Sequence, residues 1–309
     1  MDLKDLLNID YPIIQGGMAH IAKGEFAAAV SKAGALGIIG SGGMDKEELR
    51  ENIKAIRRET DKPFGVNLMM LRPDIDDLVK VILEEDVRVI TIGAGTYRRF
   101  ADDFKRKNIK VIPLISSPLQ IKRYEALEPD AYIAEGMEAG GHIGQMTTMT
   151  LLPQAVKETN KKIIGAGGIA SGKEIFAAEV LGASGVQIGT GFLFTKECPL
   201  HENYKNLLLK SNSSKVTVIG NLKGIPMRLI KNKMTREYQK LERENSLMEL
   251  EGFTLGRLKR AVVNGDVENG SVMTGLSIGS FDRILTVKDF IEKLMREYQE
   301  VKDVYKNKK

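Results

Sequence analysis

The chain has 309 residues, and 42% of them are apolar, which is enough to bury a sizeable core and excludes a disordered protein. The formal net charge of +5 is too small to indicate nucleic-acid binding, and the single cysteine, Cys198, excludes an internal disulfide framework. The three histidines show no metal-ligand spacing, no apolar run is long enough to cross a bilayer, and the N-terminus lacks the order of a signal peptide, so we expect a cytoplasmic protein without a bound metal.

Short apolar runs rich in β-branched residues recur along the chain. There are eight, at residues 11–15, 36–39, 64–68, 89–92, 111–114, 131–134, 163–166 and 186–188. Nearly continuous apolar runs are typical of strands in a parallel sheet that is covered on both faces. The segments between them have helical periodicity. Eight strands alternating with helices predict an α/β protein with the TIM (β/α)8 barrel fold.

The alternation of apolar strands and helical segments stops after about Cys198. Between residues 205 and 240 there are nine Lys and Arg against one acidic residue, Glu237. Residues 227–248 are predicted to be helical, with charges dense on one face. We therefore expect a smaller, basic and mostly helical insertion over residues 199–262, in a barrel built from residues 1–198 and 263–309. Such a segment is either a solvated cap or a docking surface for an acidic partner.

The predicted strands end in glycine-rich segments, and in a TIM barrel the loops after the strands form the active site. Glycine allows the backbone to approach a large flat or phosphorylated ligand closely. The loops after residues 163–166 and 186–188 lie where this fold usually binds phosphate. Free N–H groups there, together with the hydroxyl of Thr190, predict a phosphate site at a helix N-terminus.

His142 is the titratable side chain of most interest. It follows two glycines and comes seven residues after Glu135, at the predicted carboxyl end of the barrel. An imidazole there is suited to act as an acid, a base or a hydrogen-bond donor to a carbonyl. The alternative is a structural histidine bonded to nearby backbone. His20, after Gly16-Gly17-Met18, is a second candidate to line the pocket.

Several motifs carry a resemblance to a known family. They are residues 9–18, 62–67, 135–149, 166–169, 187–190 and 270–275, the last being Gly-Ser-Val-Met-Thr-Gly. These motifs resemble the nitronate monooxygenase superfamily, and within it the FabK-type flavin-dependent enoyl-acyl-carrier-protein reductases. The Glu-Ala-Gly-Gly-His stretch is specific to the superfamily, whereas the Thr-Thr-Met extension and the 270–275 loop favour the reductase branch. The resemblance covers nearly the whole chain.

This resemblance implies an FMN-dependent reductase of the trans-2 double bond of fatty acyl thioesters, acting in fatty acid biosynthesis with NADH or NADPH. It makes His142 the catalytic residue and puts His20 and Met273 in the substrate pocket. The residues that it implies for FMN binding are Gly16, Gly17, Met18, Asn67, Glu135, Gly140, Gly141, Ala166, Gly167, Gly168, Gln187, Gly189 and Thr190. Family members are dimers, some are activated by monovalent cations, and the acidic acyl carrier protein would be the partner of the basic segment.

The sequence departs from the reductase pattern at His20-Ile21, at Gly95-Thr96-Tyr97 and at Thr274-Gly275-Leu276. All three stretches are expected around the substrate pocket, so they affect the predicted specificity more than the flavin site. Two alternatives therefore stay open. One is a nitronate monooxygenase that oxidises alkyl nitronates with O2 on the same flavin site, and the other is a non-catalytic flavin-binding protein.

Overall fold

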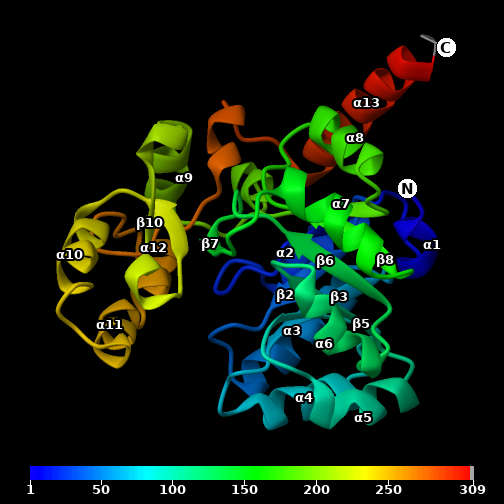
Figure 1. Ribbon diagram of the computed structural model, residues 1–309, viewed down its shortest axis with the longest axis horizontal. Coiled ribbons are helices and arrows are strands. Elements are labelled where there is room, and N and C mark those ends of the chain that lie inside the picture. The colour runs from blue at the N-terminus through cyan, green and yellow to red at the C-terminus, as the bar shows by residue number, and fades with distance from the viewer. Residues whose placement is uncertain (307–309) are drawn as a thin grey trace.

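A closed eight-stranded parallel barrel forms the centre of the molecule, seen in a computed structural model that describes residues 1–306 (Figure 1). The strands are neighbours in the order β1-β9-β8-β6-β5-β4-β3-β2, and a parallel bridge between Ile14 and Leu36 joins β1 to β2. Their bounds are β1 Ile13–Gln15, β2 Gly37–Gly40, β3 Phe64–Met69, β4 Val89–Ala94, β5 Lys110–Ile115, β6 Ala131–Glu135, β8 Lys162–Ala166 and β9 Gly185–Ile188. The predicted TIM barrel is confirmed.

Helices cover the outside of the barrel because each crossover between parallel strands packs against the outer face of the sheet. They are α2 Gly24–Lys32, α3 Lys46–Glu59, α4 Ile75–Glu84, α5 Ala101–Arg106, α6 Leu119–Tyr124, α7 Thr148–Glu158, α8 Gly172–Val180 and the closing helix α13 Val287–Lys306. The N-terminal helix α1 Leu3–Leu7 precedes β1, and its Leu3 and Leu7 pack against the residues inside the barrel. Short 3-10 turns occur at Arg98–Phe100, Glu125–Leu127, Thr190–Phe194, Ser213–Lys215, Asn221–Lys223 and Leu276–Ser280. Helix α13 lies beside α8 (Figure 1).

The alternation of side chains along each strand determines which polar side chains face the inside of the barrel. Ile14, Ile38, Ile133 and Ile164 pack together inside the barrel and are fully buried. Side chains alternate between the two faces of a strand, so the residue two positions after each of these also faces the barrel axis. At the carboxyl end of β6 that residue is Glu135. The fold therefore places a carboxyl group on the inner face, next to the loops that follow the strands.

A cap is inserted after the last barrel strand and lies to one side of the carboxyl end (Figure 1). It contains α9 Glu202–Leu209, β10 Val216–Ile219, β11 Met227–Ile230, α10 Lys233–Leu241, α11 Leu247–Thr254 and α12 Arg257–Asn264. Strand β11 pairs with β10 on one side and with the short strand β7, Gly141–His142, on the other. A three-stranded antiparallel sheet thus connects the cap to the loop that follows β6.

The prediction of one helix over residues 227–248 is wrong. Residues 227–230 form strand β11, and two helices follow it, each with its own N-terminal cap. Asn232 caps α10 by accepting the N–H of Thr235, and Ser246 caps α11 by accepting the N–H of Glu249. Both caps have the reciprocal hydrogen bonds of a capping box, which mark helix starts. The strand forms because β10 and β7 satisfy its backbone groups on both sides.

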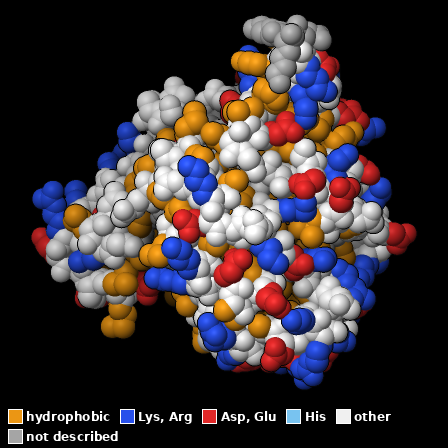
Figure 2. All heavy atoms as spheres, turned by 45° about the vertical axis from the view of Figure 1, so that its right-hand side comes forward, with side chains coloured by type: hydrophobic (Ala, Val, Ile, Leu, Met, Phe, Trp, Pro, Cys, Tyr) orange, Lys and Arg blue, Asp and Glu red, His pale blue; other side chains and the backbone are white. Residues whose placement is uncertain are grey.

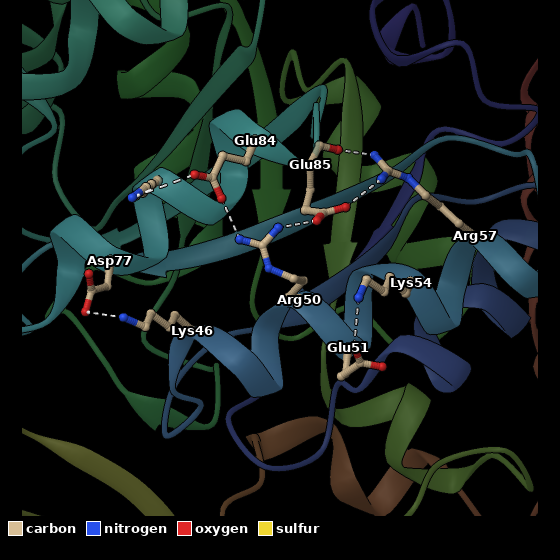
Figure 3. Close-up of polar contacts among 9 residues, drawn as sticks. Lys46, Arg50, Glu51, Lys54, Arg57, Asp77, Glu84 and Glu85 are labelled. Carbon is tan, nitrogen blue, oxygen red and sulfur yellow. Dashed lines mark hydrogen bonds and ion pairs between the residues drawn. The ribbon is translucent and has the colours of Figure 1, made fainter.

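The outer surface of the barrel carries intermixed acidic and basic side chains (Figure 2). On α3 and α4 they form an ion-pair network centred on Arg50, whose guanidinium contacts Glu84 and Glu85, with Arg57 also paired to Glu85 (Figure 3). The network lines a depression of about 160 Å³. Its charges are paired with one another, which is typical of a solvated helical surface. Within residues 1–306 no helix is both long enough and apolar enough to span a membrane.

Candidate active site at the carboxyl end of the barrel

Loops far apart in the sequence meet at the carboxyl end of the barrel, and one of their contacts requires glycine. A Cβ atom added to Gly17 would lie 2.4 Å from Cβ of Asn67, and one added to Gly16 would lie 3.4 Å from Cα of Gly189. The first distance leaves no room for any side chain at residue 17. The structure therefore brings together the loop after β1, the strand β3 and the loop after β9, which the resemblance assigns to flavin binding. Met18, in the same loop, is half-buried.

Asn67 faces the barrel axis because it alternates with inward-facing Gly65, the partner of Ile38. Its Nδ2 group donates to Oγ1 of Thr91 at 2.8 Å, which fixes the orientation of the amide. Within residues 1–306 its Oδ1 atom accepts no hydrogen bond. A carbonyl oxygen held in this way is suited to accept an N–H of a planar ring system.

The loops after β8 and β9 expose backbone donors. Gly167 and Gly168 both have positive φ values, of 92° and 75°, a conformation that turns the chain sharply after the strand. In the described part of the chain the N–H groups of Gly168 and Gly189 have no backbone acceptor, and a Cβ atom on Gly189 would meet open space. Thr190 Oγ1 accepts the N–H of Gly275 at 2.9 Å, so its own proton stays available to a ligand. These donors fit a phosphate group.

Ala166 and Gln187 form the buried floor beneath these loops. They are directly paired across β8 and β9, and their side chains are 1% and 6% exposed. Ala166 and Gln187 therefore lie next to the backbone N–H donors of these loops, and their own side chains are almost inaccessible to solvent. Within residues 1–306 no group of three His, Cys, Asp or Glu side chains is arranged to hold a metal ion.

Glu135 is a carboxyl group without a charged partner. No ion pair or hydrogen bond forms at its side chain among the described residues, and burial raises its pKa to about 7. The side chain of Glu138, three residues later, is instead tied to the start of α7. Its carboxylate accepts the N–H of Thr148 at 3.0 Å and also the hydroxyl of Thr148. The two acids of this loop thus have different roles, the first facing the site and the second holding the loop.

The segment that carries His142 is packed against the 270–275 loop. A Cβ atom on Gly140 would lie 2.5 Å from the backbone of Thr274, and one on Gly141, whose φ is 76°, would lie 3.6 Å from Sδ of Met273. Met273 and His142 therefore lie close to each other. The ring of His142 is exposed and makes no hydrogen bond within the described chain, while the surrounding protein reduces its hydration and lowers its pKa.

His20 lies at the same end of the barrel but packs differently. It has a positive φ of 62°, and its imidazole covers Gly43, where an added Cβ would lie 2.4 Å from the ring. Burial and the positive charge of Lys259 in α12 both lower its pKa. His20 therefore lies between the barrel and the cap, on the cap side of the site.

Arg228 was missed by the sequence interpretation, which counted it among exposed basic residues of the cap. The structure corrects this, because its side chain is only 4% exposed and donates to the carbonyls of Met137 and Ala139. The local sequence held no clear signal of this burial, because residues 227–230 read Met-Arg-Leu-Ile and are too few to establish a strand period.

The residues at this end of the barrel fit a flavin mononucleotide. Asn67 offers an oriented amide oxygen to a ring, and the glycine backbone leaves open space at Gly189. The N–H groups of Gly168 and Gly189 and the hydroxyl of Thr190 provide donors for a phosphate at a distance from the ring position. The site thus combines a surface for a planar ring with a phosphate cradle.

Comparison with known proteins decides the family. The nitronate monooxygenase family model matches residues 1–80 and 74–297. The chain belongs to the nitronate monooxygenase family. It is a flavin-dependent oxidoreductase of this superfamily, and the resemblance inferred from the motifs is confirmed. A probable nitronate monooxygenase of Staphylococcus saprophyticus is 31% identical over 77% of this chain and 81% of that protein.

Two further relatives align with nearly the whole of this nitronate monooxygenase family member. The structure of FabK from Thermotoga maritima superposes with a TM-score of 0.96 at 43% identity, covering 99% of this chain and 98% of that one. In Mycobacterium tuberculosis, (3aS,4S,5R,7aS)-5-hydroxy-7a-methyl-1-oxo-octahydro-1H-indene-4-carboxyl-CoA dehydrogenase is 28% identical, covering 95% of this chain and 94% of that protein. The similarity therefore includes the cap as well as the barrel.

Proposed function

We propose that the protein is an FMN-dependent enoyl-acyl-carrier-protein reductase, which reduces the trans-2 double bond of fatty acyl thioesters with NADH or NADPH in fatty acid biosynthesis. The observation that carries the proposal is the similarity to FabK, at 43% identity over 99% of the chain, together with the FabK-type motifs around His142. The name of the mycobacterial relative describes a carboxyl-CoA substrate, which supports a thioester as the substrate class. FabK-type reductases are dimers, so we propose a homodimer.

When bound, FMN supplies the hydride chemistry, and the protein supplies orientation and electrostatics. In this proposal Asn67 accepts an N–H of the ring, and Gly17 allows the ring to approach the backbone. The N–H groups of Gly168 and Gly189 and the hydroxyl of Thr190 hold the phosphate. Asn67 and Thr190 are already oriented by hydrogen bonds to Thr91 and Gly275, which reduces the entropy lost on binding.

His142 acts on the substrate carbonyl. Because its pKa lies below the usual value of 6.5, the imidazole is neutral at pH 7 and has one N–H to donate. A hydrogen bond from this N–H to the thioester oxygen stabilises the negative charge that develops there as the double bond is reduced. Met273, next to His142, and His20, on the cap side, are proposed to line the substrate pocket.

The cap supplies a docking surface for the acidic carrier protein. Lys231, Lys233 and Arg236 are exposed at the start of the segment that includes α10. Electrostatic attraction of this kind raises the association rate and orients the partner. Arg228 is not part of this surface, because it is buried.

A second function is supported by relatives that are named probable nitronate monooxygenases, at 29% to 31% identity. That reaction would use the same flavin site and an exposed imidazole near the reacting atoms. The two functions differ in their reductant, because only the reductase requires rapid reduction by a nicotinamide nucleotide.

The deciding experiment is a visible spectrum of the purified protein, recorded without oxygen before and after addition of NADH or NADPH. We expect a yellow protein that bleaches with either nucleotide and recovers its colour when an enoyl thioester is added. Bleaching by an alkyl nitronate and not by a nicotinamide nucleotide would favour the monooxygenase. A protein that binds FMN but is not reduced by any of these compounds would contradict both enzymatic functions.

A further inference from the structure

Arg228 is a buried cation, and the carboxylate of Glu138 acts on it only from beyond ion-pair distance. Its side chain is 4% exposed, and in the described part of the chain it forms no ion pair. Its Nε atom is buried and has no hydrogen-bond partner among the described residues. Burial also lowers the pKa of its guanidinium. A charge in this position costs free energy that hydrogen bonds to carbonyl groups offset only in part, so stability alone does not account for it.

The guanidinium contacts a single loop, the one between β6 and β7. One terminal nitrogen donates to the carbonyl of Met137 and, at 3.4 Å, to the carbonyl of Ala139. The carbonyl between them, that of Glu138, accepts the N–H of Leu276 at 2.9 Å. Three consecutive carbonyl groups are therefore held by donors from outside the loop, two of them by the same arginine.

The backbone of β11 holds the next residues of the same segment. In the antiparallel register Met227 lies opposite His142, and Arg228 lies opposite Gly141. The N–H of Ile143 donates to the carbonyl of Pro226 at 3.0 Å. The side chain of Arg228 and the main chain around it thus fix the segment before His142 and His142 itself from one strand of the cap.

We propose that Arg228 is a positioning residue for His142, which connects the cap to the reacting end of the barrel by holding the carbonyls of Met137 and Ala139. Without the guanidinium, the carbonyls of Met137 and Ala139 lose these donors, and β7 itself pairs with β11 over only two residues. A strand that short is easily opened, so the imidazole would no longer be held in one place. The ring then donates its hydrogen bond less often in the geometry that the reaction needs.

The test compares three variants of the holoenzyme. Arg228→Met removes the donors at similar length, and Arg228→Lys keeps a charge that reaches one carbonyl at a time. Arg257→Met is the matched control, because Arg257 also donates to two carbonyls within the cap region, those of Phe253 and Asn269. Amide hydrogen exchange of residues 137–143 is measured by mass spectrometry, and kcat and KM are measured with an enoyl thioester.

For Arg228→Met we expect exchange in residues 137–143 to be faster by about tenfold or more. We expect kcat to fall by roughly 10- to 100-fold with KM changed much less, because the loss is one of geometry at the reacting atoms. Arg228→Lys should recover part of both properties, and Arg257→Met should change neither. If Arg228→Met does not fold, Arg228→Lys carries the test, with intermediate exchange and kcat expected.

Exchange at the wild-type rate in the folded Arg228 variants would overturn the inference, and so would faster exchange with unchanged kcat. The kcat measurement rests on the proposed function, whereas hydrogen exchange does not. If the wild-type protein shows no enoyl reductase activity, the proposed function fails, and the exchange data still decide whether Arg228 holds the loop that carries His142.

Discussion

The two titratable groups nearest the reacting end of the barrel, His142 and Glu135, both have pKa values shifted because the surrounding protein reduces their hydration. For His142 the shift is downward, and for Glu135 it is upward to about 7. In both cases the neutral form is favoured, because a charged form loses hydration and no opposite charge compensates for it. Near pH 7 the imidazole of His142 is therefore neutral, and the carboxyl of Glu135 is close to the midpoint of its titration.

Replacement of His142 tests its proposed role. His142→Ala removes the N–H donor, and we expect turnover of an enoyl thioester to fall by roughly 10²- to 10⁴-fold. His142→Gln keeps an N–H donor of similar reach and should retain part of the activity. Both variants should bind FMN with an unchanged visible spectrum, because the imidazole of His142 is not among the groups proposed to hold the flavin. Unchanged turnover in His142→Ala would remove this residue from the mechanism.

Glu135 gives a prediction about the pH dependence of stability. Its pKa is about 7 in the folded state and near 4.5 in the unfolded state, so between these pH values the folded state holds more protons. Stability therefore falls as pH rises through this window, and the loss is complete above pH 7. Glu135→Gln should abolish this loss, which amounts to about 3–4 kcal/mol at ~1.4 kcal/mol for each pH unit.

The measurement for this prediction is urea denaturation of the flavin-free wild-type and Glu135→Gln proteins at pH 4.5 and pH 8.5. We expect the variant to be the more stable of the two at the higher pH. The same difference in unfolding free energy between the two proteins at both pH values would show that the carboxyl of Glu135 titrates normally in the folded state.

At the scale of elements, loop glycines decide how closely the segments at the end of the barrel approach one another. Gly17→Ala would place a Cβ atom 2.4 Å from Cβ of Asn67 and displace its amide from Thr91. Overpacking of this kind costs about 1–3 kcal/mol, so we expect FMN affinity to fall by roughly tenfold or more while the fold is kept. FMN fluorescence titration measures this change.

Gly252→Ala is the matched control, because Gly252 lies within α11 and an added Cβ there would meet nothing within 4 Å. It should bind FMN as the wild-type protein does. An equal loss of affinity in both variants, or none in Gly17→Ala, would contradict the proposed contact between the loop after β1 and the flavin ring.

Strand β11 shows how an element can escape prediction. Residues 227–230 are too few for a period of two to stand out, and the basic residues that follow favour a helix. The strand forms because β10 and β7 lie on either side of it and pair with its backbone. Its partner β7 is distant in the sequence, so no local pattern around residue 227 reports the pairing.

At the scale of the whole molecule, positive charge is concentrated in the cap. Residues 199–262 contain thirteen Lys and Arg and six Asp and Glu, an excess larger than the net charge of +5 of the whole chain. The rest of the chain is therefore slightly acidic. A carrier protein with negative charge would be attracted to the cap and not to the barrel helices.

Reversal of the exposed charges tests this docking surface. The triple variant Lys231→Glu, Lys233→Glu, Arg236→Glu should raise KM for carrier-protein thioesters at low salt, and the effect should shrink as salt is added. Coenzyme A thioesters should be affected much less. The double variant Lys157→Glu, Lys161→Glu, at exposed positions at the end of α7 and beyond it, serves as the control. Equal effects on both classes of thioester would contradict docking at the cap.

The sequence by itself determined the barrel and its family. Strands buried on both faces are apolar along most of their length, so the eight runs marked the barrel strands β1–β6, β8 and β9 to within a few residues. The glycines that follow these runs allow the loops at the carboxyl end of the barrel to approach one another closely. The motifs that contain these glycines were enough to indicate the family. The roles of individual site residues, such as Asn67 and Thr190, stay predictions.

Only the tertiary structure decided which charges are buried and which loops are held. Arg228 and its neighbour Lys231 look alike in the sequence, yet one lies beneath the loop before His142 and the other is exposed. The pKa of Glu135 depends equally on residues from other strands that surround it. The burial of a side chain and the partners of a charged group depend on residues that are distant in the sequence and adjacent in the fold. The sequence around each group therefore does not reveal them.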